Sequence, residues 1–280
     1  MTALIAALPM YDWPEARSEV DCQWTRLRGV LREGGIAAPD RLARRNADMP
    51  AAPGGIRGAS GDILAPDPAV LAPDGLDMRV LWLHPALLLS QTCWGPMELG
   101  MAPHVQFVGQ PDYSAFEGGT GPLYRSAIVM RRDDISAAGE CPVTQAEPGG
   151  SIPLERLRGR RLAYNSEDSM SGLLALSRDL DAAGAGLDIF AERIATGGHR
   201  ASVVAVAEGR ADVAAIDCRS WAMARRFEPA SGDLVVVGWT ARRKGLPFIT
   251  SRVTPPDVLA ILRGALAGEG MLAEDQGRSA

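Results

Sequence analysis

The chain has 280 residues and a formal net charge of -5, and hydrophobic residues make up 46% of it. This hydrophobic content is ordinary for a globular protein and too high for a disordered chain. The densest basic runs, at 158–161 and 242–244, are short. Because binding to a nucleic acid depends on many clustered cations, we expect no nucleic-acid partner.

Four scattered cysteines, Cys22, Cys93, Cys141 and Cys218, form no C-x-x-C pair and have no histidine at metal-ligand spacing. We therefore expect no zinc site, and such thiols suit a reducing compartment. The apolar stretch at 4–8 has no basic residues before it and is too short for a signal sequence or a membrane span. The expectation is a protein not inserted in a membrane, cytoplasmic if this start is native and periplasmic if a leader was removed.

The first third of the chain predicts a strand over 4–10 and then a helix with Asp12 as its N-cap. A stripe at helical spacing marks the buried face of that helix, and Gly34-Gly35 ends it. Residues 45–78 are rich in Ala, Pro, Gly and Asp and predict a long surface excursion with at most one short strand near 63–64. The residues of the stripe are Val20, Trp24, Leu27 and Leu31.

The remaining chain alternates short apolar strands with helical patterns, apart from a loose loop predicted at 136–152. Such alternation predicts an α/β fold with mostly parallel sheets and right-handed crossovers. The predicted strands are 87–92, 105–109, 124–130, 161–165, 192–195, 211–217, 234–239 and 247–250. Helices are expected after Gly95, Gly172 and His199, and over 220–226 and 257–267.

Three polar turns share one design, in which a buried strand ends and a helix begins. They are Gln91-Thr92, Ser169-Met170-Ser171-Gly172 and Thr196-Gly197-Gly198-His199. Such turns gather at the carboxyl edge of a parallel sheet, where the free N–H groups of helix starts can hold an oxyanion. The alternative for each turn is simple helix capping.

Further candidates stand at strand ends. His199 either makes a structural hydrogen bond or, when protonated, contacts an anion. Asp217 either caps the next helix or accepts hydrogen bonds from a ligand, and Tyr11 is either core or a pocket wall. Nucleophile-elbow, P-loop, dinucleotide-binding and H-E-x-x-H motifs are absent, so we expect no catalytic residue, metal or cofactor.

These residues resemble the phosphate/phosphonate substrate-binding family of ABC transporters, in the type II periplasmic-binding-protein superfamily. The matching pieces, in the family's order, are LPMYD at 8–12, LLSQTC at 88–93, GPLYRS at 121–126, NSEDSMSG at 165–172, TGGHRAS at 196–202 and GRADVAAID at 209–217.

The resemblance implies two α/β lobes, each with a mixed, mostly parallel sheet flanked by helices, and a ligand cleft between them. The first lobe would comprise residues 1–122 plus 219–280 and the second residues 123–218. The expected function is solute binding without catalysis, with a small phosphonate- or phosphate-like oxyanion as ligand and an ABC permease as partner.

The resemblance also implies roles for particular residues. Family phosphonate binders grip phosphoryl oxygens with a Ser-Thr-Ser-Gly helix start, which here reads Ser169-Met170-Ser171-Gly172. Met170 removes one hydroxyl donor, so another small anion is the alternative ligand. His199 and Asp217 match ligand-facing residues of the family, and Tyr11 corresponds to its pocket aromatic.

Two other functions remain open on the same fold. Some enzymes of the menaquinone pathway are similar to binding proteins, and in such an enzyme His199 or Asp217 would act as general acid or base. The other alternative is a cytoplasmic sensor that passes lobe closure to a partner protein.

Overall fold

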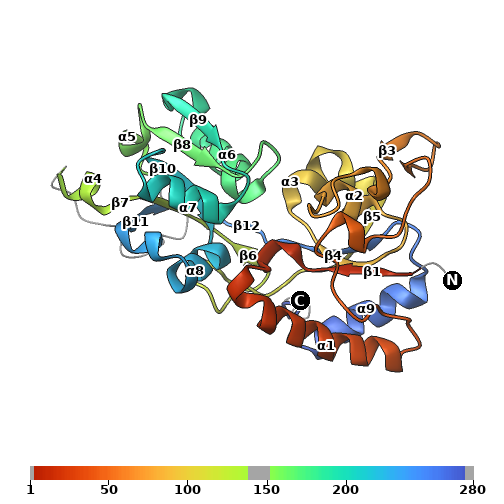
Figure 1. The fold of residues 1–280 in the computed structure, drawn as a ribbon. Helices are drawn as coiled ribbons and strands as arrows, with labels where there is room; N and C mark the ends of the chain where they lie inside the picture. Colours follow the sequence, from red (N-terminus) through yellow and green to blue (C-terminus); the bar gives the residue numbers. More distant parts are fainter. Residues whose placement is uncertain (1–2, 138–151, 275–280) are drawn as a thin grey trace. The chain divides into compact units, whose positions relative to one another are not determined.

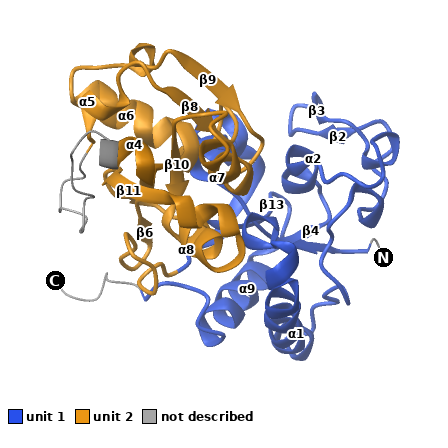
Figure 2. Ribbon diagram, turned by 60° about the vertical axis from the view of Figure 1, so that its left-hand side comes forward, with its two compact units in different colours: residues 1–111, 246–280 blue, residues 112–245 orange. Residues whose placement is uncertain are grey.

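The computed structural model describes residues 3–137 and 152–274 (Figure 1). The chain divides into two compact units: unit 1 comprises Met1–Pro111 with Leu246–Ala280, and unit 2 comprises Asp112–Gly245 (Figure 2). The predicted strand–helix alternation is present in both units.

The unit boundaries differ from the lobe boundaries expected from the sequence, which assigned residues 219–245 to the first lobe. In the structure β11 (Leu234–Trp239) pairs with β7 (Ser126–Arg131). Likewise β12 (Arg243–Lys244) pairs with β6 (Leu123–Tyr124). Backbone hydrogen bonds of these ladders therefore keep residues 219–245 in unit 2.

Unit 1 is built on a four-stranded sheet in the order β1-β4-β13-β5. Strand β1 (Ile5–Ala7) runs parallel to β4 (Leu87–Gln91). Strand β13 (Phe248–Ser251) runs antiparallel to both β4 and β5 (Val105–Gly109). Side chains alternate between the two faces: Ala6 packs in one core cluster, whereas Ile5 and Ala7 pack in the other.

One face of this sheet is covered by α1 (Arg17–Glu33) and α9 (Pro256–Gly268), which lie side by side (Figure 1). The predicted stripe of α1 is buried, and Gly35 ends the helix with a φ of 82°. The N-cap prediction was wrong: α1 follows the 3-10 turn η2 (Pro14–Ala16). Asp12 instead accepts a hydrogen bond from Arg44 Nη2 at 3.0 Å.

The other face is covered by α2 (Met78–Leu83) and by the residues that follow β4. These form α3 (Trp94–Pro96), a π-helical turn η5 (Met97–Met101) and a 3-10 turn η6 (Ala102–His104). The excursion between the first helix and α2 contains two short paired strands instead of the expected one. Its elements are η3 (Asn46–Asp48), β2 (Ile56–Arg57), β3 (Ile63–Ala65) and η4 (Pro68–Val70).

Unit 2 is built on a five-stranded mixed sheet in the order β11-β7-β10-β8-β9. Strands β8 (Arg161–Tyr164), β9 (Glu192–Ala195) and β10 (Val213–Asp217) are mutually parallel, and β7 runs antiparallel to β10. Parallel strands need crossover connections, and helices supply them here.

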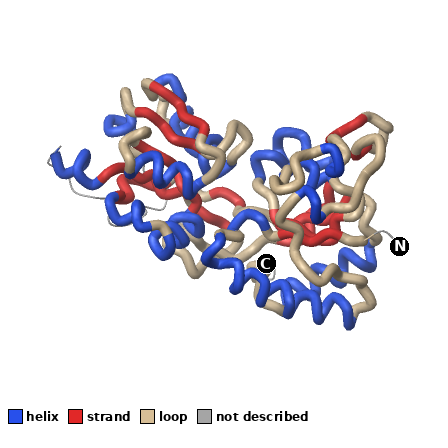
Figure 3. The backbone as a smooth tube through the Cα atoms, in the orientation of Figure 1, coloured by secondary structure: helices blue, strands red, loops and turns tan. Residues whose placement is uncertain are grey.

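Helices lie on both faces of the unit 2 sheet (Figure 3). The π-helical turn η7 (Met170–Leu174), α6 (Ala175–Ala182) and α5 (Leu154–Leu157) form one core cluster with the strands. Helices α7 (His199–Ala207) and α8 (Cys218–Phe227) pack against the strands and each other. The shorter elements are α4 (Arg132–Ala137), η8 (Leu187–Ile189) and η9 (Pro229–Asp233).

The loop predicted at 136–152 lies largely outside the described residues, as does Cys141. Among the helices within the described ranges, none combines the length and the apolar character needed to cross a membrane.

Candidate functional site

Three helical segments of unit 2 begin where parallel strands end: η7 follows β8, α7 follows β9 and α8 follows β10. Because these strands are neighbours and parallel, their carboxyl ends share one edge of the sheet. This edge is where open α/β sheets bind ligands. It collects five of the eight predicted site residues: Ser169, Met170, Ser171, His199 and Asp217.

Ser171, His199 and Asp217 form one hydrogen-bonded cluster. The Oγ of Ser171 lies 2.8 Å from Nε2 of His199, and Oδ2 of Asp217 lies 3.1 Å from the same nitrogen. The two side chains of the His–Asp pair are 10% and 2% exposed, so little water reaches them. Nδ1 of His199 is buried and has no hydrogen-bond partner among the described residues.

Burial lowers the pKa of His199, and the nearby Asp217 carboxylate raises it only in part. The ring is therefore neutral at neutral pH and carries one proton. In the serine-hydrolase triad, the serine and the aspartate contact different imidazole nitrogens. Here both contact Nε2, so the ring cannot pass a proton from serine to a nitrogen opposite the carboxylate. The arrangement suits binding and does not match that catalytic geometry.

Asp217 has two roles, so the capping interpretation of this residue is confirmed. Its Oδ1 accepts hydrogen bonds from the backbone N–H groups of Arg219 at 3.1 Å and Ser220 at 2.9 Å, which caps α8. Its Oδ2 faces His199. The cap fixes the carboxylate, so the second oxygen is held in position beside the imidazole.

The segment at 169–172 contains both a helix cap, Ser169, and a member of the hydrogen-bonded cluster, Ser171. Ser169 Oγ accepts from the Gly172 N–H at 3.0 Å, the capping role that was one of the two interpretations. Met170 is 1% exposed. A Cβ at Gly172 would lie 2.8 Å from Oδ1 of Asn165, so only glycine fits without a shift.

The start of α7 leaves donors open. Its N-cap, Gly198, has no side chain, and the first N–H groups of a helix have no intrahelical partner. The preceding Gly197 has a φ of 85°, a conformation that glycine adopts without strain. Thr196 is structural, because its Oγ1 lies 2.7 Å from Ser202 Oγ and holds the turn onto α7.

Sequence reasoning missed Ser126, which lies opposite Asp217 in the β7–β10 pairing. Its Oγ donates to the Ser171 carbonyl at 2.9 Å, and its N–H donates to Thr240 Oγ1 at 2.8 Å. Ser126 therefore positions the 169–172 segment. A polar residue inside the apolar run 126–130 was the available signal.

The other three predicted residues, Tyr11, Gln91 and Thr92, belong to unit 1. They lie near the carboxyl ends of the parallel strands β1 and β4 and are all buried. Gln91 Nε2 donates to the Leu246 carbonyl at 3.1 Å, which ties β4 to the chain entering β13. Thr92 Oγ1 is buried without a hydrogen-bond partner among the described residues.

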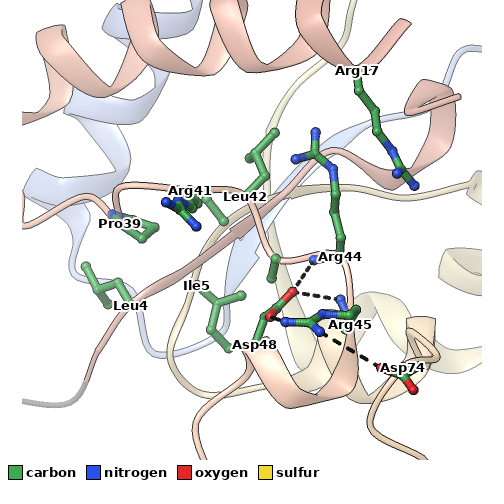
Figure 4. A pocket seen from close by; sticks show the side chains of 12 residues that line it. Leu4, Ile5, Arg17, Pro39, Arg41, Leu42, Arg44, Arg45, Asp48 and Asp74 are labelled. Atoms are coloured by element: carbon green, nitrogen blue, oxygen red, sulfur yellow. Dashed lines mark hydrogen bonds and ion pairs between the residues drawn. The ribbon is translucent and has the colours of Figure 1, made fainter. Parts of the chain in front are cut away.

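A hollow of about 640 Å³ in unit 1 contains none of the predicted residues (Figure 4). Two of the arginines that line it are bonded to aspartates: Arg44 to Asp12 and Asp21, and Arg45 to Asp48. The hydrogen bond with Asp12 is the main cause that raises the pKa of Arg44. Within the described ranges, no cluster of side chains is suited to hold a metal ion.

Comparison with known proteins gave one family and several similar folds. The model of the family described as "ABC transporter, phosphonate, periplasmic substrate-binding protein" matches residues 99–279. No match was found among curated proteins.

Among solved structures, PhnD1 from Prochlorococcus marinus in complex with methylphosphonate is 14% identical, with a TM-score of 0.61 over 95% of this chain and 83% of that one. A binding protein component of an ABC phosphonate transporter from Pseudomonas aeruginosa is 13% identical, with a TM-score of 0.58 over 98% and 81%. A protein from Xanthomonas citri bound to ATP is 18% identical, with a TM-score of 0.55 over 95% and 82%. At these identities the likeness shows the fold, which is the α/β fold of periplasmic binding proteins predicted from the sequence.

Proposed function

Because the chain belongs to the family of periplasmic substrate-binding proteins of phosphonate ABC transporters, we propose that it binds a small phosphonate- or phosphate-like oxyanion at the Ser171–His199–Asp217 cluster. The family is one of solute-binding proteins, so the chain is a binding protein and not an enzyme. The alternative of a menaquinone-pathway-like enzyme is accordingly not favoured.

The convergence of hydrogen-bonding side chains and a helix start at one sheet edge carries this proposal. The Ser171 hydroxyl and the His199 imidazole meet within 2.8 Å, next to the open N-terminus of α7. N–H and O–H donors that are already fixed in place can replace the water around an oxyanion without a lysine or arginine. The positive end of the helix dipole at α7 adds to this attraction.

Met170 affects which class of oxyanion we expect as the ligand. Its thioether donates no hydrogen bond, and it stands where the family motif has a threonine hydroxyl. The ligand therefore receives one hydroxyl donor fewer than the resemblance alone implies. A ligand that carries an apolar substituent, such as an alkylphosphonate, suits this composition, whereas inorganic phosphate would leave an oxygen less well satisfied.

Three further residues that the resemblance implies belong to unit 1. Thr92 offers a buried hydroxyl with no partner among the described residues, and Tyr11 and Gln91 lie at the same sheet edge. The family implies a permease as partner and a periplasmic location, and we extend both to this chain.

Isothermal titration calorimetry with methylphosphonate and with phosphate tests the proposal. Ser171→Ala should weaken binding at least about tenfold, because a hydrogen bond to a charged group contributes about 1.5–3 kcal/mol. His199→Gln should weaken binding further, since it removes the imidazole.

Ser231→Ala is the matched control. It also removes a buried hydroxyl from unit 2, but that hydroxyl bonds the Ala224 carbonyl at the far end of α8. Its affinity should equal that of the wild type. Absence of binding by the wild type, or equal affinity in all three variants, would contradict the proposed site.

A further inference from the structure

The hollow of about 640 Å³ in unit 1 lies beside the edge strand β1, the first turn of α1 and the loop that follows α1 (Figure 4). A volume of this size is typical of sites for small organic molecules. Every residue that lines it belongs to unit 1, so the hollow is complete within one unit. Four of these residues are arginines: Arg17, Arg41, Arg44 and Arg45.

Two of the four arginines are neutralised by carboxylates that also shape the loop. Arg44 Nη2 donates to Asp12 Oδ1 at 3.0 Å and to Asp21 Oδ1 at 2.9 Å. Arg45 Nη2 donates to Asp48 Oδ1 at 2.9 Å. Asp48 Oδ2 also accepts from the backbone N–H groups of Arg44 and Arg45, both at 3.0 Å. These bonds hold the loop in place and add no net charge to the hollow.

The other two arginines, Arg17 and Arg41, are not neutralised in this way. Both are exposed, and their side chains form no ion pair or hydrogen bond with other residues that the structure describes. The remaining acidic residue of the lining, Asp74, lies 3.9 Å from Arg45. A guanidinium carries five N–H donors and stays charged at physiological pH. The hollow therefore presents two positive charges that the described residues leave uncompensated.

The floor of the hollow is apolar and fixed. Leu42 is buried in the core cluster on one face of the unit 1 sheet, and the half-buried Leu4 packs against the same cluster. The backbone N–H of Ala43 donates to the Ala6 carbonyl at 2.7 Å, which ties the loop to β1. An apolar floor beside free cations suits a molecule that has both an apolar body and an anionic group.

We propose that this hollow is a second binding site, which takes a phosphate ester with an apolar body. A phosphate monoester carries nearly two negative charges at neutral pH and three acceptor oxygens, so it matches two guanidinium groups better than a single carboxylate does. Arg17 and Arg41 would bind the phosphate, and the apolar body would lie on Leu4 and Leu42. The proposal goes beyond the proposed function, because none of these residues belongs to the Ser171–His199–Asp217 cluster.

Calorimetry with 1-naphthyl phosphate, in excess methylphosphonate to fill the proposed oxyanion site, tests the second site. The wild type should bind one equivalent of the probe, with an affinity that falls as salt is added, because exposed charges are screened. Arg17→Gln and Arg41→Gln should each weaken binding by about fivefold. Arg252→Gln is the matched control, since Arg252 is an exposed arginine in the turn after β13, outside the hollow. It changes the net charge equally and should bind the probe as the wild type does.

The result that overturns the second site takes one of three forms: no binding of the probe by the wild type, equal affinity in the wild type, Arg17→Gln and Arg41→Gln, or the same weakening in Arg252→Gln. Displacement of the probe by methylphosphonate, together with loss of binding in His199→Gln, would assign the probe to the unit 2 cluster and also overturn it. The affinity for methylphosphonate, measured alone, should be the same in all three arginine variants. Failure of the second site therefore leaves the proposed function standing.

Discussion

The two ends of β10 carry two aspartates that the fold uses in opposite ways. Asp212, just before the strand, accepts from Arg131 at 3.0 Å and from Arg161 at 2.8 Å. Asp217, at the end of the strand, accepts from backbone N–H groups with one oxygen and faces His199 with the other. Both carboxylates are buried, with side chains 13% and 2% exposed.

This comparison distinguishes a structural carboxylate from one at a candidate binding site. The hydrogen bond from Arg161 is the main cause that holds the pKa of Asp212 well below its usual range, although burial opposes it. The negative charge of Asp212 is neutralised by two arginines that stay charged, so this carboxylate has a structural role. Asp217 instead faces the imidazole of His199, which becomes positively charged when it binds a proton. The electrostatic surroundings of Asp217 can therefore change, whereas those of Asp212 are fixed.

Asp212→Asn should give the largest loss of stability. It removes the charge from a mostly buried cluster, leaves Arg161 without its bonded carboxylate and leaves Arg131 with the carboxylate of Asp134, at a cost of about 3 kcal/mol. Urea denaturation followed by circular dichroism measures this loss. A variant as stable as the wild type would show that the two arginines are satisfied without the carboxylate.

Lowering the pH should reduce the stability that Asp212 contributes, and this effect should be smaller than that of Asp212→Asn. A depressed pKa means that the contribution of Asp212 is fully present above the unfolded-state value of about 3.9 and is lost as the pH falls through the lower folded value. The stability gap between the wild type and Asp212→Asn should therefore narrow below about pH 4. Urea denaturation at a series of pH values measures the gap, and a constant gap would contradict this assignment.

Ser169→Ala should cost about 1 kcal/mol of stability, because its Oγ caps the segment that begins at Met170. Ser171→Ala should cost less, since Ser171 Oγ bonds a side chain and no backbone N–H. Thermal denaturation of the pair checks the order. The reverse order would mean that the cluster contributes more to folding than the cap does.

The smallest change in stability is expected for Asp217→Asn, below about 1 kcal/mol, because asparagine preserves the cap. Its main effect should fall on ligand binding. Denaturation of Asp217→Asn beside Asp212→Asn tests the comparison itself, since equal losses would mean that both aspartates are structural.

The sequence was sufficient to predict most strands and the residues that end them. His199 could be selected because it follows Gly197-Gly198 before a helical pattern, and Asp217 because it ends a predicted buried strand. The pairing of Asp212 with two arginines was not predicted, because these arginines come from β7 and β8 and are brought together only by strand pairing. Asp12 was assigned as an N-cap for a similar reason: Arg44, its partner, is 32 residues away.

The boundary between the two units also could not be predicted from local sequence patterns. Residues 219–245 join unit 2 through the pairing of β11 with β7, a contact between segments about a hundred residues apart. Local patterns report burial and helix starts, whereas long-range pairing depends on the assembled sheet. Ser126 was missed for the same reason, because its hydrogen bond to the Ser171 carbonyl joins residues 45 positions apart.

Nuclear magnetic resonance of labelled histidine tests the central claim most directly. The chain has three histidines, so His199→Gln assigns the relevant signal. We expect His199 to titrate below the ordinary histidine pKa of about 6.5 without ligand, because it is buried, and at a higher pH with methylphosphonate. A His199 signal that neither shifts nor changes its titration when methylphosphonate is added would contradict an oxyanion site at this sheet edge.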